Sequence, residues 1–424
     1  MSDETFRPRG PELPSLAGAE WLSRLETRVV LAAFNFAGVP ARIVGGAVRN
    51  ALLGRAVKDI DIATPALPDR VSEIAKNAGL DCIPTGIDHG TVTIIANHTP
   101  FEITTLRRDV ETDGRRATVA FTDDWTEDAS RRDFTINALY CDADGQIFDP
   151  LDGYPDILAR RVRFIGRAED RIREDYLRIL RFFRFTAEYT DGQPDAAGLA
   201  ASRDLADGLS RVSAERIRAE LLRLLVAPGA VTAIHAMDRA GILGRILGKT
   251  PRPECLARLA AIEEALKLDP DALRRLAVLA VRIPGAALSL RDALKLSTAE
   301  YERIAHMSLP ERAYDPQSPE SDAKAAIYRH DPEGYRDGLL YAWATGELRH
   351  SDPRMQDRLR LAERWSPPEF PVRGQDLLHL GVPSGPEVGR ILRTLEDWWI
   401  GAGFPTDPAI LARRLNDLVK VSRS

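Results

Sequence analysis

The pattern of apolar residues changes near Arg171, and this change constrains the fold more than any other feature of the chain. Before it, short segments with alternating apolar residues and glycine turns, typical of strands, lie between helical segments. After it, nearly all apolar residues follow helical spacing, in segments that end at proline or glycine. No repeat of fixed period accompanies this spacing. We therefore predict an α+β fold, with a small mixed sheet flanked by helices near the N-terminus and an all-α remainder.

The length of 424 residues exceeds what one compact core accommodates, so several domains are expected. We divide the chain into a flexible polar leader (1–18), a mixed head (19–160), a helical neck (161–228) and a helical body and tail (229–424). The leader lacks the apolar core of a signal peptide. No apolar run reaches the ~18 residues that span a bilayer, so we expect no membrane partner.

The cysteines indicate the compartment in which the protein works. Cys82, Cys141 and Cys255 are widely spaced and odd in number, which fits neither a disulfide framework nor a zinc site. We therefore expect a reducing, cytoplasmic environment.

Charge is unevenly distributed along the chain. The net charge of −5 argues against a general nucleic-acid coat. Residues 160–184, however, hold nine arginines against four acidic residues, with Phe182 and Phe183 among them and Phe185 directly after them. A local basic excess of this kind favours phosphate binding more than the whole-chain sum opposes it.

Patterning predicts the order of elements within the head. The expected elements are a helix at 19–38, a strand at 41–46, a helix at 48–53, a strand at 59–64, a helix at 68–78, a β-hairpin from 90 to 107 that turns at His98-Thr99-Pro100, a mobile loop at 107–125, a helix at 127–142 and a hairpin at 142–153. In the rear half we expect a flexible joint at 309–323 and two helices within 374–399.

The first candidate functional cluster joins a glycine turn to a pair of acids. Gly45 and Gly46 let the backbone approach a ligand, and the helix that follows carries Arg49. Strand alternation sends Asp59 and Asp61 to one face. Two carboxylates on one edge repel unless a cation lies between them, and Mg²⁺ commonly shares its coordination with substrate phosphates. Each element alone is usually a turn or a solvated strand end, but their order and spacing predict nucleotidyl transfer.

The second cluster is RRDFTINAL, residues 131–139. On the predicted helix, Asp133 and Asn137 lie one turn apart, next to Arg132. An arginine, a carboxylate and an amide grouped in this way can hold a phosphate and a ribose hydroxyl together. Each member alone is also compatible with a helix cap and a salt bridge.

The third cluster is EDYLRILRFFR, residues 174–184, in which Arg178, Arg181 and Arg184 recur every three residues. Asp175 and Arg178 can present an acceptor and a donor to the edge of a base. Such a pair favours C and A, which carry an amino group, over U and G, since a buried polar group left unpaired is costly. Acid–arginine pairs at this spacing are otherwise common surface salt bridges.

Together these motifs resemble those of the class II nucleotidyltransferases of the polymerase-β superfamily, the bacterial tRNA CCA-adding enzymes and their poly(A) polymerase relatives. The matching stretches are VGGAVRNALLG…KDIDIAT, RRDVETDGRRA, EDASRRDFTINAL and RIREDYLRILRFFRF, over roughly residues 40–190 and in the family's order. The segment GQDLLHLGVPSGPEVG also resembles the tail of alphaproteobacterial-type members. The resemblance implies a polymerase-β-like head followed by a helical neck, body and tail.

The resemblance also implies roles for individual residues. It assigns Asp59 and Asp61 to catalytic Mg²⁺, with Glu102 where a third carboxylate could complete the site. The residues that it assigns to nucleotide binding are Gly45, Gly46, Arg49, Arg132, Asp133, Asn137, Asp175, Arg178, Arg181 and Arg184.

Two positions depart from the family pattern. Asn50 stands where the family usually has aspartate, so that position lacks a charge. The loop reads Gly114-Arg115-Arg116-Ala117 where GRHA is common, which removes any role for a histidine there.

The activity implied by the resemblance is template-independent addition of C, C and A to the 3′ end of tRNA from CTP and ATP, with release of pyrophosphate. The partners would be the tRNA acceptor end and the two nucleotides, with no role for DNA. Poly(A) polymerase, and enzymes that add only CC or only A, share every motif above. An alternative outside this class is a non-catalytic RNA-binding protein. The complete set of acidic residues and arginines argues against it, because such a protein does not need them. A phosphohydrolase would need partners for His330 and Asp331, and the rear half offers no convincing histidines.

Overall fold

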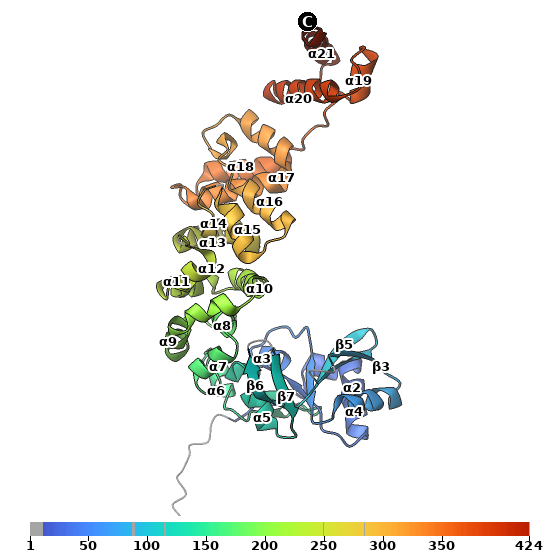
Figure 1. Ribbon diagram of the computed structural model, residues 1–424, viewed down its shortest axis with the longest axis vertical. Coiled ribbons are helices and arrows are strands. Elements are labelled where there is room, and N and C mark those ends of the chain that lie inside the picture. The colour runs from blue at the N-terminus through green and yellow to red at the C-terminus, as the bar shows by residue number, and fades with distance from the viewer. Residues whose placement is uncertain (1–11, 87–89, 114–115, 249, 284, 424) are drawn as a thin grey trace, which may run out of the picture. The chain divides into compact units, whose positions relative to one another are not determined.

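The computed structural model describes residues 12–86, 90–113, 116–248, 250–283 and 285–423 (Figure 1). The chain forms two compact units, 1–250 and 251–424. The boundaries proposed for the neck, at 160/161 and 228/229, both fall within the first of these units.

The first unit contains a seven-stranded mixed sheet in the order β3-β4-β5-β2-β1-β8-β9. Only the β2–β5 pair is parallel, and the other neighbours are antiparallel. The strands of this sheet are β1 (Arg42–Val44), β2 (Asp61–Thr64), β3 (Asp81–Gly86), β4 (Thr91–Ala96), β5 (Thr99–Thr105), β8 (Tyr140–Cys141) and β9 (Ile147–Phe148). The predicted small mixed sheet is thus confirmed.

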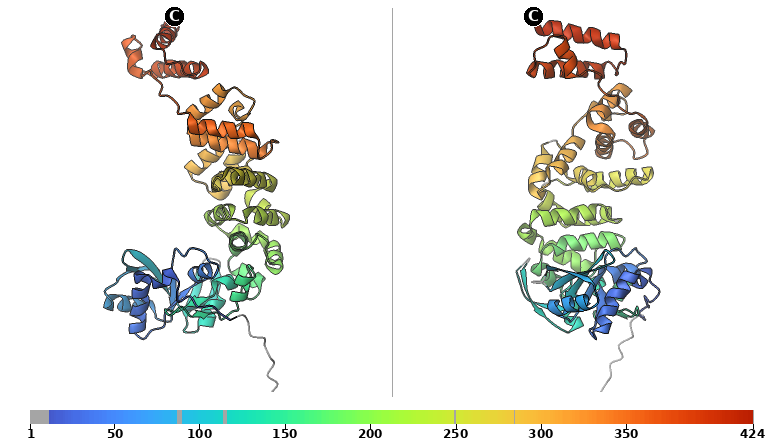
Figure 2. Two further views of the ribbon diagram at one scale, coloured as in Figure 1. Left: turned by 180° about the vertical axis from the view of Figure 1, so that it is seen from behind. Right: turned by 90° about the vertical axis from the view of Figure 1, so that its right-hand side faces the viewer.

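Helices flank the sheet and continue after it, and both views of Figure 2 show the green helices of this unit stacked on one another. The helices of the first unit are α1 (Glu20–Ser23), α2 (Leu25–Phe36), α3 (Gly46–Leu52), α4 (Pro68–Asn77), α5 (Trp125–Ser130), η2 (Thr135–Asn137), α6 (Tyr154–Leu158), α7 (Ala168–Glu174), α8 (Arg178–Tyr189), α9 (Ala196–Asp204), η3 (Ala206–Arg211), α10 (Ala214–Leu225), α11 (Ala230–Arg239) and α12 (Ile242–Leu247).

The predicted hairpin from 90 to 107 is confirmed as β4 and β5. Its turn lies one position earlier than expected, because Asn97 and His98 adopt positive φ angles of 46° and 62°, which suit a tight hairpin turn. Within β5, Phe101 and Ile103 are buried while Glu102 is exposed, as alternation predicts. The strand therefore presents Glu102 on its polar face.

The prediction of a mobile loop at 107–125 is wrong. The backbone forms a separate two-stranded antiparallel sheet from β6 (Arg107–Asp113) and β7 (Arg116–Phe121). Val110 and Thr112 in β6 and Thr118, Val119 and Phe121 in β7 favour strands more than their charged neighbours oppose them. Of the motif Gly114-Arg115-Arg116-Ala117, the first two residues lie outside the described ranges.

Two predicted helices are also wrong in extent. The helix at 19–38 is interrupted at Arg24, whose ψ of 140° is extended, and Thr27 Oγ1 donates to the Trp21 carbonyl across the break (2.9 Å). The helix at 127–142 ends at Ser130 and gives way to an extended Phe134 and the short η2. Phe134 forms an isolated β-bridge to Phe164, and their rings lie 4.9 Å apart.

The aromatic residues of the basic segment form a core. On α8, Phe182, Phe183 and Phe185 are buried, and the Phe185 ring lies 5.1 Å from that of Phe134. Packing of aromatic rings of this kind stabilises by roughly 0.5–1.5 kcal/mol per pair beyond the area buried. This core fixes α8 against the segment that contains RRDFTINAL.

In the second unit, all secondary structure within the described residues is helical, as the periodicity predicts. Its helices are α13 (Pro253–Leu266), α14 (Ala272–Ala280), α15 (Ala286–Leu294), α16 (Thr298–Met307), η4 (Arg312–Tyr314), α17 (Glu320–Thr345), α18 (Pro353–Arg364), α19 (Gly374–His379), α20 (Pro386–Gly401) and α21 (Pro408–Arg423). The two helices expected within 374–399 are thus α19 and α20.

The flexible joint expected at 309–323 is instead packed. It contains η4, whose Tyr314 is buried against α17, because this aromatic ring outweighs the polar residues around it. His330 Nε2 lies 2.5 Å from Glu311 Oε1, and no group of three metal-ligating side chains forms among the residues described. No described helix has the length and apolar content needed to cross a membrane.

Candidate functional site

The glycine turn between β1 and α3 requires glycine at its first position. Gly45 has φ 71° and ψ −115°, a conformation that side chains disfavour. A Cβ at Gly45 would also lie 3.5 Å from the Asn137 carbonyl oxygen and 3.7 Å from Arg132 Nη1. The turn thus brings the backbone against the segment that carries RRDFTINAL.

Asn50 interacts directly with Arg49. Its Oδ1 accepts hydrogen bonds from Arg49 Nε (3.2 Å) and Nη2 (2.9 Å). The amide therefore supplies the acceptor that a carboxylate would, without neutralising the guanidinium charge.

Three carboxylates lie close enough to interact at β2 and β5, two neighbouring inner strands of the sheet. Asp61 begins β2 and is the register partner of Glu102 on β5. Asp59 precedes β2, and exposure alternates as expected, with Ile60 and Ile62 buried and the two aspartates exposed. Desolvation and then the charge of Glu102 raise the pKa of Asp61, with Asp59 adding to this effect and Arg132 opposing it.

These acids fit a divalent cation that shares its coordination with a substrate. Among the described side chains, none hydrogen-bonds to or forms an ion pair with the carboxylates of Asp59, Asp61 or Glu102. The mutual repulsion is therefore offset only by the more distant charge of Arg132, with which Asp61 forms no ion pair. No group of three or more metal-ligating side chains forms within the described ranges. Asp59, Asp61 and Glu102 offer oxygen atoms alone, which suits a hard divalent cation that takes part of its coordination from phosphate oxygens.

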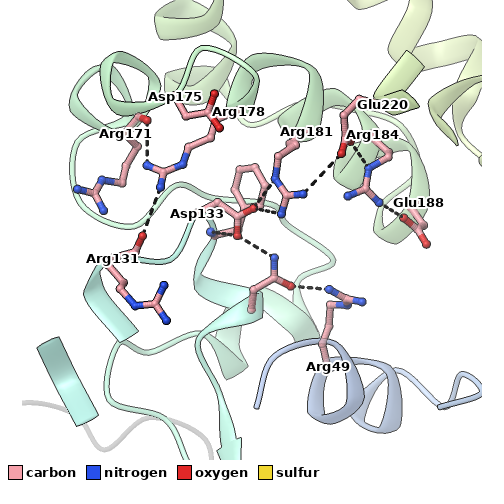
Figure 3. Close-up of polar contacts among 12 residues, drawn as sticks. Arg49, Arg131, Asp133, Arg171, Asp175, Arg178, Arg181, Arg184, Glu188 and Glu220 are labelled. Carbon is pink, nitrogen blue, oxygen red and sulfur yellow. Dashed lines mark hydrogen bonds and ion pairs between the residues drawn. The ribbon is translucent and has the colours of Figure 1, made fainter. Parts of the chain in front are cut away.

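A closed chain of polar contacts, here called the polar ring, links α3, η2, α8 and α10, and Figure 3 shows the part of it that runs from Arg49 to Glu188. Arg49 Nη1 donates to Asn137 Oδ1 (2.5 Å), and Asn137 Nδ2 donates to Asp133 Oδ1 (2.9 Å). Arg181 Nε then donates to Asp133 Oδ2 (2.9 Å), and Arg49 Nη2 closes the ring on Tyr189 (2.6 Å). The members in order are Arg49, Asn137, Asp133, Arg181, Glu220, Arg184, Glu188 and Tyr189.

Protonation is well defined at two members of the polar ring. Burial alone would raise the pKa of Asp133, but Arg181 and the amide of Asn137 hold it below its usual range. Burial raises the pKa of Tyr189 to about 12. Asp133 thus accepts as a carboxylate, while Tyr189 stays a neutral phenol that donates to Glu188 (3.0 Å).

Asp128 anchors the arginine pair. Its Oδ1 accepts from Arg131 Nε (2.8 Å), while Oδ2 accepts from Arg132 Nη2 (2.9 Å) and from the Tyr140 hydroxyl (2.8 Å). Asp128 is 1% exposed. Burial would raise its pKa, but the two arginines lower it overall. Asp128 therefore fixes the direction of the Arg132 side chain.

Replacing Asp128 by alanine is expected to destabilise the first unit by about 3 kcal/mol, because it leaves buried cationic and hydroxyl groups without their acceptor. Thermal unfolding should show this as a lower Tm, while the exposed neighbour Asp123→Ala should unfold like wild type. Because the folded-state pKa is lowered, the stabilisation is present at neutral pH and is lost as the pH falls through that value. Equal Tm values for both variants would contradict the anchoring role.

Asp175 and Arg178 are each held by other residues. Asp175 lies between α7 and α8, and its carboxylate forms a two-point contact with Arg216 of α10. Arg178 Nη1 donates to Glu174 Oε2 (2.5 Å) and to the Arg171 carbonyl (2.9 Å). Figure 3 shows the Arg178 guanidinium directed towards Arg171 and Arg131.

One cavity of about 460 Å³ gathers most of these groups. Six arginines and three aspartates line it, so it carries an excess of positive charge suited to a polyphosphate. The lining residues are Gly45, Gly46, Arg49, Asp61, Arg131, Arg132, Asp133, Asn137, Asp175, Leu177, Arg178, Arg181, Phe185 and Arg216.

Three predicted site residues do not line this cavity: Asp59, Glu102 and Arg184. The first two lie beside Asp61, as described above. Arg184 instead bonds to Glu220 (2.5 Å) and Glu188 (3.1 Å), and so contributes to the polar ring.

Sequence reasoning did not identify Arg216, Asp128 or Tyr189. Arg216 lies on α10, and its segment has only the pattern of an ordinary amphipathic helix. Asp128 belongs to an acidic helix start, a common surface feature. Arg131 also lines the cavity without having been predicted. Its position next to Arg132 in the RRDFTINAL motif is a local signal that could have identified it.

The chain matches two family models: "Poly A polymerase head domain" over residues 41–163, and "Probable RNA and SrmB- binding site of polymerase A" over residues 194–254. It is 37% identical over 370 residues to CCA tRNA nucleotidyltransferase 1, mitochondrial, of Danio rerio, covering 84% of this chain and 83% of the relative. It is 32% identical over 381 residues to the CCA-adding enzyme of Lactobacillus johnsonii, covering 87% and 90%.

A solved structure agrees with these relatives. The crystal structure of the Bacillus stearothermophilus CCA-adding enzyme in complex with CTP superimposes with a TM-score of 0.70 at 26% identity, covering 94% of this chain and 98% of that one. With head, helical remainder and site motifs in one order over most of the chain, the protein belongs to the family of the CCA tRNA nucleotidyltransferases, or CCA-adding enzymes.

Proposed function

We propose that this chain adds C, C and A to the 3′ end of tRNA from CTP and ATP, without a nucleic-acid template and with release of pyrophosphate. The observation that carries the proposal is the 460 Å³ cavity, which brings Asp61 together with arginines from α8, α10 and the RRDFTINAL segment. The printed names of the relatives, which specify CCA addition to tRNA, support it.

The arginines of the cavity would bind the triphosphate. Arg132 lies beside Gly45 and Arg49 beside Gly46 of the glycine turn, where the backbone leaves room for phosphate oxygens. The polar atoms of Asn137 and Asp133 are engaged with Arg49 and Arg181. Their role would be to orient these guanidinium groups beside the ribose and phosphates, because a fixed fork loses less freedom on binding.

The acids would serve the reacting end of the nucleotide. Asp59 and Asp61 would hold Mg²⁺, which when bound lowers the pKa of the attacking 3′ hydroxyl and stabilises charge on the phosphates. Glu102 would add negative charge to that cation site from the neighbouring strand. Positioning of the tRNA end and of the triphosphate by the cavity would supply the rest.

The base would be read by Asp175 and Arg178. A carboxylate accepts from the exocyclic amino group of C or A, and a guanidinium donates to a ring acceptor. U and G carry a carbonyl oxygen in place of that amino group. This oxygen would face a carboxylate oxygen of Asp175 with no hydrogen between them, which disfavours those bases. The helical remainder would contact the tRNA by shape and phosphate groups.

Incubation with tRNA that lacks its 3′ end tests the proposal. With CTP alone the tRNA should gain two residues, with ATP alone a tRNA ending in CC should gain one, and with both the product should end in CCA. A long ladder from ATP would indicate poly(A) polymerase instead. Incorporation of only CC or only A would indicate a partial enzyme, and CTP binding without any incorporation a non-catalytic protein.

We further propose that the protein works in the reducing cytoplasm. All three of its cysteines are free, and Cys141 and Cys255 are buried. This state suits a compartment that keeps thiols reduced.

A further inference from the structure

The carboxylate of Asp175 is held by a residue outside every motif recognised in the sequence. Arg216 Nη2 donates to Asp175 Oδ2 (2.7 Å), and Arg216 Nη1 donates to Oδ1 (3.3 Å). The Leu177 amide also donates to Oδ1 (3.1 Å). Arg216 is 30% and Asp175 21% exposed at the side chain, and both line the cavity.

Arg178 does not supply this support. Its guanidinium donates to Glu174 and to the carbonyl oxygens of Arg171 (2.9 Å) and Arg131 (3.3 Å). The two members of the base-reading pair are thus oriented by different groups: Arg178 by α7 and the Arg131 carbonyl, and Asp175 by Arg216 of α10 and the Leu177 amide. The orientation of Asp175 therefore depends on Arg216 and on one backbone amide.

Counting lone pairs shows what this contact leaves open. A carboxylate offers about four acceptor positions. The two acceptor positions on Oδ1 are occupied by the Arg216 guanidinium and the Leu177 amide. On Oδ2, only Arg216 donates among the contacts described, so one acceptor position remains. That position is available for one donor, as the amino group of C or A requires.

We infer that Arg216 is a positioning residue for base selection: its two-point contact fixes the Asp175 carboxylate so that one acceptor position on Oδ2 faces the incoming base. The inference rests on the proposed function, in which Asp175 reads the base. Bidentate arginine–carboxylate contacts define geometry as well as energy, and a lysine, which is a point charge, cannot reproduce them.

Without Arg216 the carboxylate would rotate and could meet a U or G edge through water or through a different oxygen. Discrimination between CTP and UTP should therefore fall, while the catalytic acids and the triphosphate arginines stay in place. A loss of support that was merely structural would instead lower incorporation of all nucleotides alike.

The test measures kcat/KM for CTP and for UTP separately, on tRNA lacking its 3′ end, with full-length Arg216→Gln, Arg216→Lys and wild type. Arg216→Gln should lower the CTP/UTP ratio by about ten- to a hundredfold, the range for one charged hydrogen bond. Arg216→Lys should lie between the two. Arg223→Gln, on the exposed face of the same helix, should keep the wild-type ratio.

A double-mutant cycle separates positioning from folding. In an Asp175→Asn background, Arg216→Gln should change the ratio no further, because the group that it orients is already altered. Equal losses for CTP and UTP in Arg216→Gln, or additive effects in the cycle, would overturn the inference. If wild type itself incorporated neither C nor A, the proposed function would fail, and that outcome is visible before any Arg216 variant is measured.

Discussion

Replacing Asp61 by asparagine is expected to lower nucleotide incorporation by about a thousandfold or more while tRNA binding stays unchanged. The variant keeps the shape of the side chain and removes the charge that would hold Mg²⁺ beside the triphosphate. Loss of several kcal/mol of charge stabilisation in the transition state corresponds to this factor. The measurement is single-turnover incorporation of labelled CTP, with a tRNA filter-binding assay in parallel.

The same substitution should raise the Tm of the free protein. Desolvation and the charges of Glu102 and Asp59 raise the pKa of Asp61, which means that at neutral pH its ionised form opposes folding. The neutral amide of the Asp61→Asn variant would relieve that repulsion, and Mg²⁺ with CTP should stabilise wild type but not the variant. Asp81→Asn, exposed at the start of β3, is the matched control for both readouts.

Asp59→Ala should also abolish incorporation. This variant tests the metal site more stringently than Asp61→Asn, because Asp59 does not line the cavity. Full activity in this variant would remove Asp59 from the metal site and leave Asp61 with Glu102 as the remaining candidates.

Replacing Arg132 by glutamine is expected to reduce incorporation of both CTP and ATP by roughly a hundredfold, through transition-state charge that is no longer stabilised. Asp128 holds Nη2 of this guanidinium (2.9 Å), while Nη1, which would lie 3.7 Å from a Cβ at Gly45, forms no hydrogen bond among the described contacts. Arg132 therefore keeps donors for phosphate oxygens. Initial rates at saturating and limiting nucleotide would show whether the loss lies in kcat, in KM or in both.

Two variants make this result interpretable. Arg132→Lys should recover little activity, since an ammonium lacks the planar fork. Arg70→Gln, an exposed arginine of α4, should behave like wild type. A loss confined to one nucleotide would mean that Arg132 contacts the base and not the triphosphate.

Periodicity predicts those parts of the fold in which local preference and burial agree. The α4 helix, the β4–β5 hairpin and the helical second unit all have an apolar face of the right period. The segment from Arg131 to Leu139 does not follow its local pattern, because Phe134 packs against Phe164 and Phe185 and holds the backbone extended. Its irregular backbone is stabilised by contacts with residues distant in sequence.

The site shows the same division. Motif residues such as Arg49, Asp61 and Arg178 could be named from the sequence because their spacing is short and characteristic. Arg216 meets Asp175 across a separation of 41 residues, and neither residue's neighbours indicate the contact. Pairings of this kind depend on how α8 and α10 pack, which the pattern of either helix alone does not determine.

The polar ring has a consequence for attempts to change what the enzyme incorporates. Each member of the polar ring is held by its two neighbours, so the effects of substitutions within the ring will not be additive. In a library of single substitutions, most variants of these residues will therefore have lost at least one contact of the ring. Laboratory evolution of new nucleotide preferences should instead advance through paired, compensating replacements, with the donor on one helix exchanged together with its acceptor on the next.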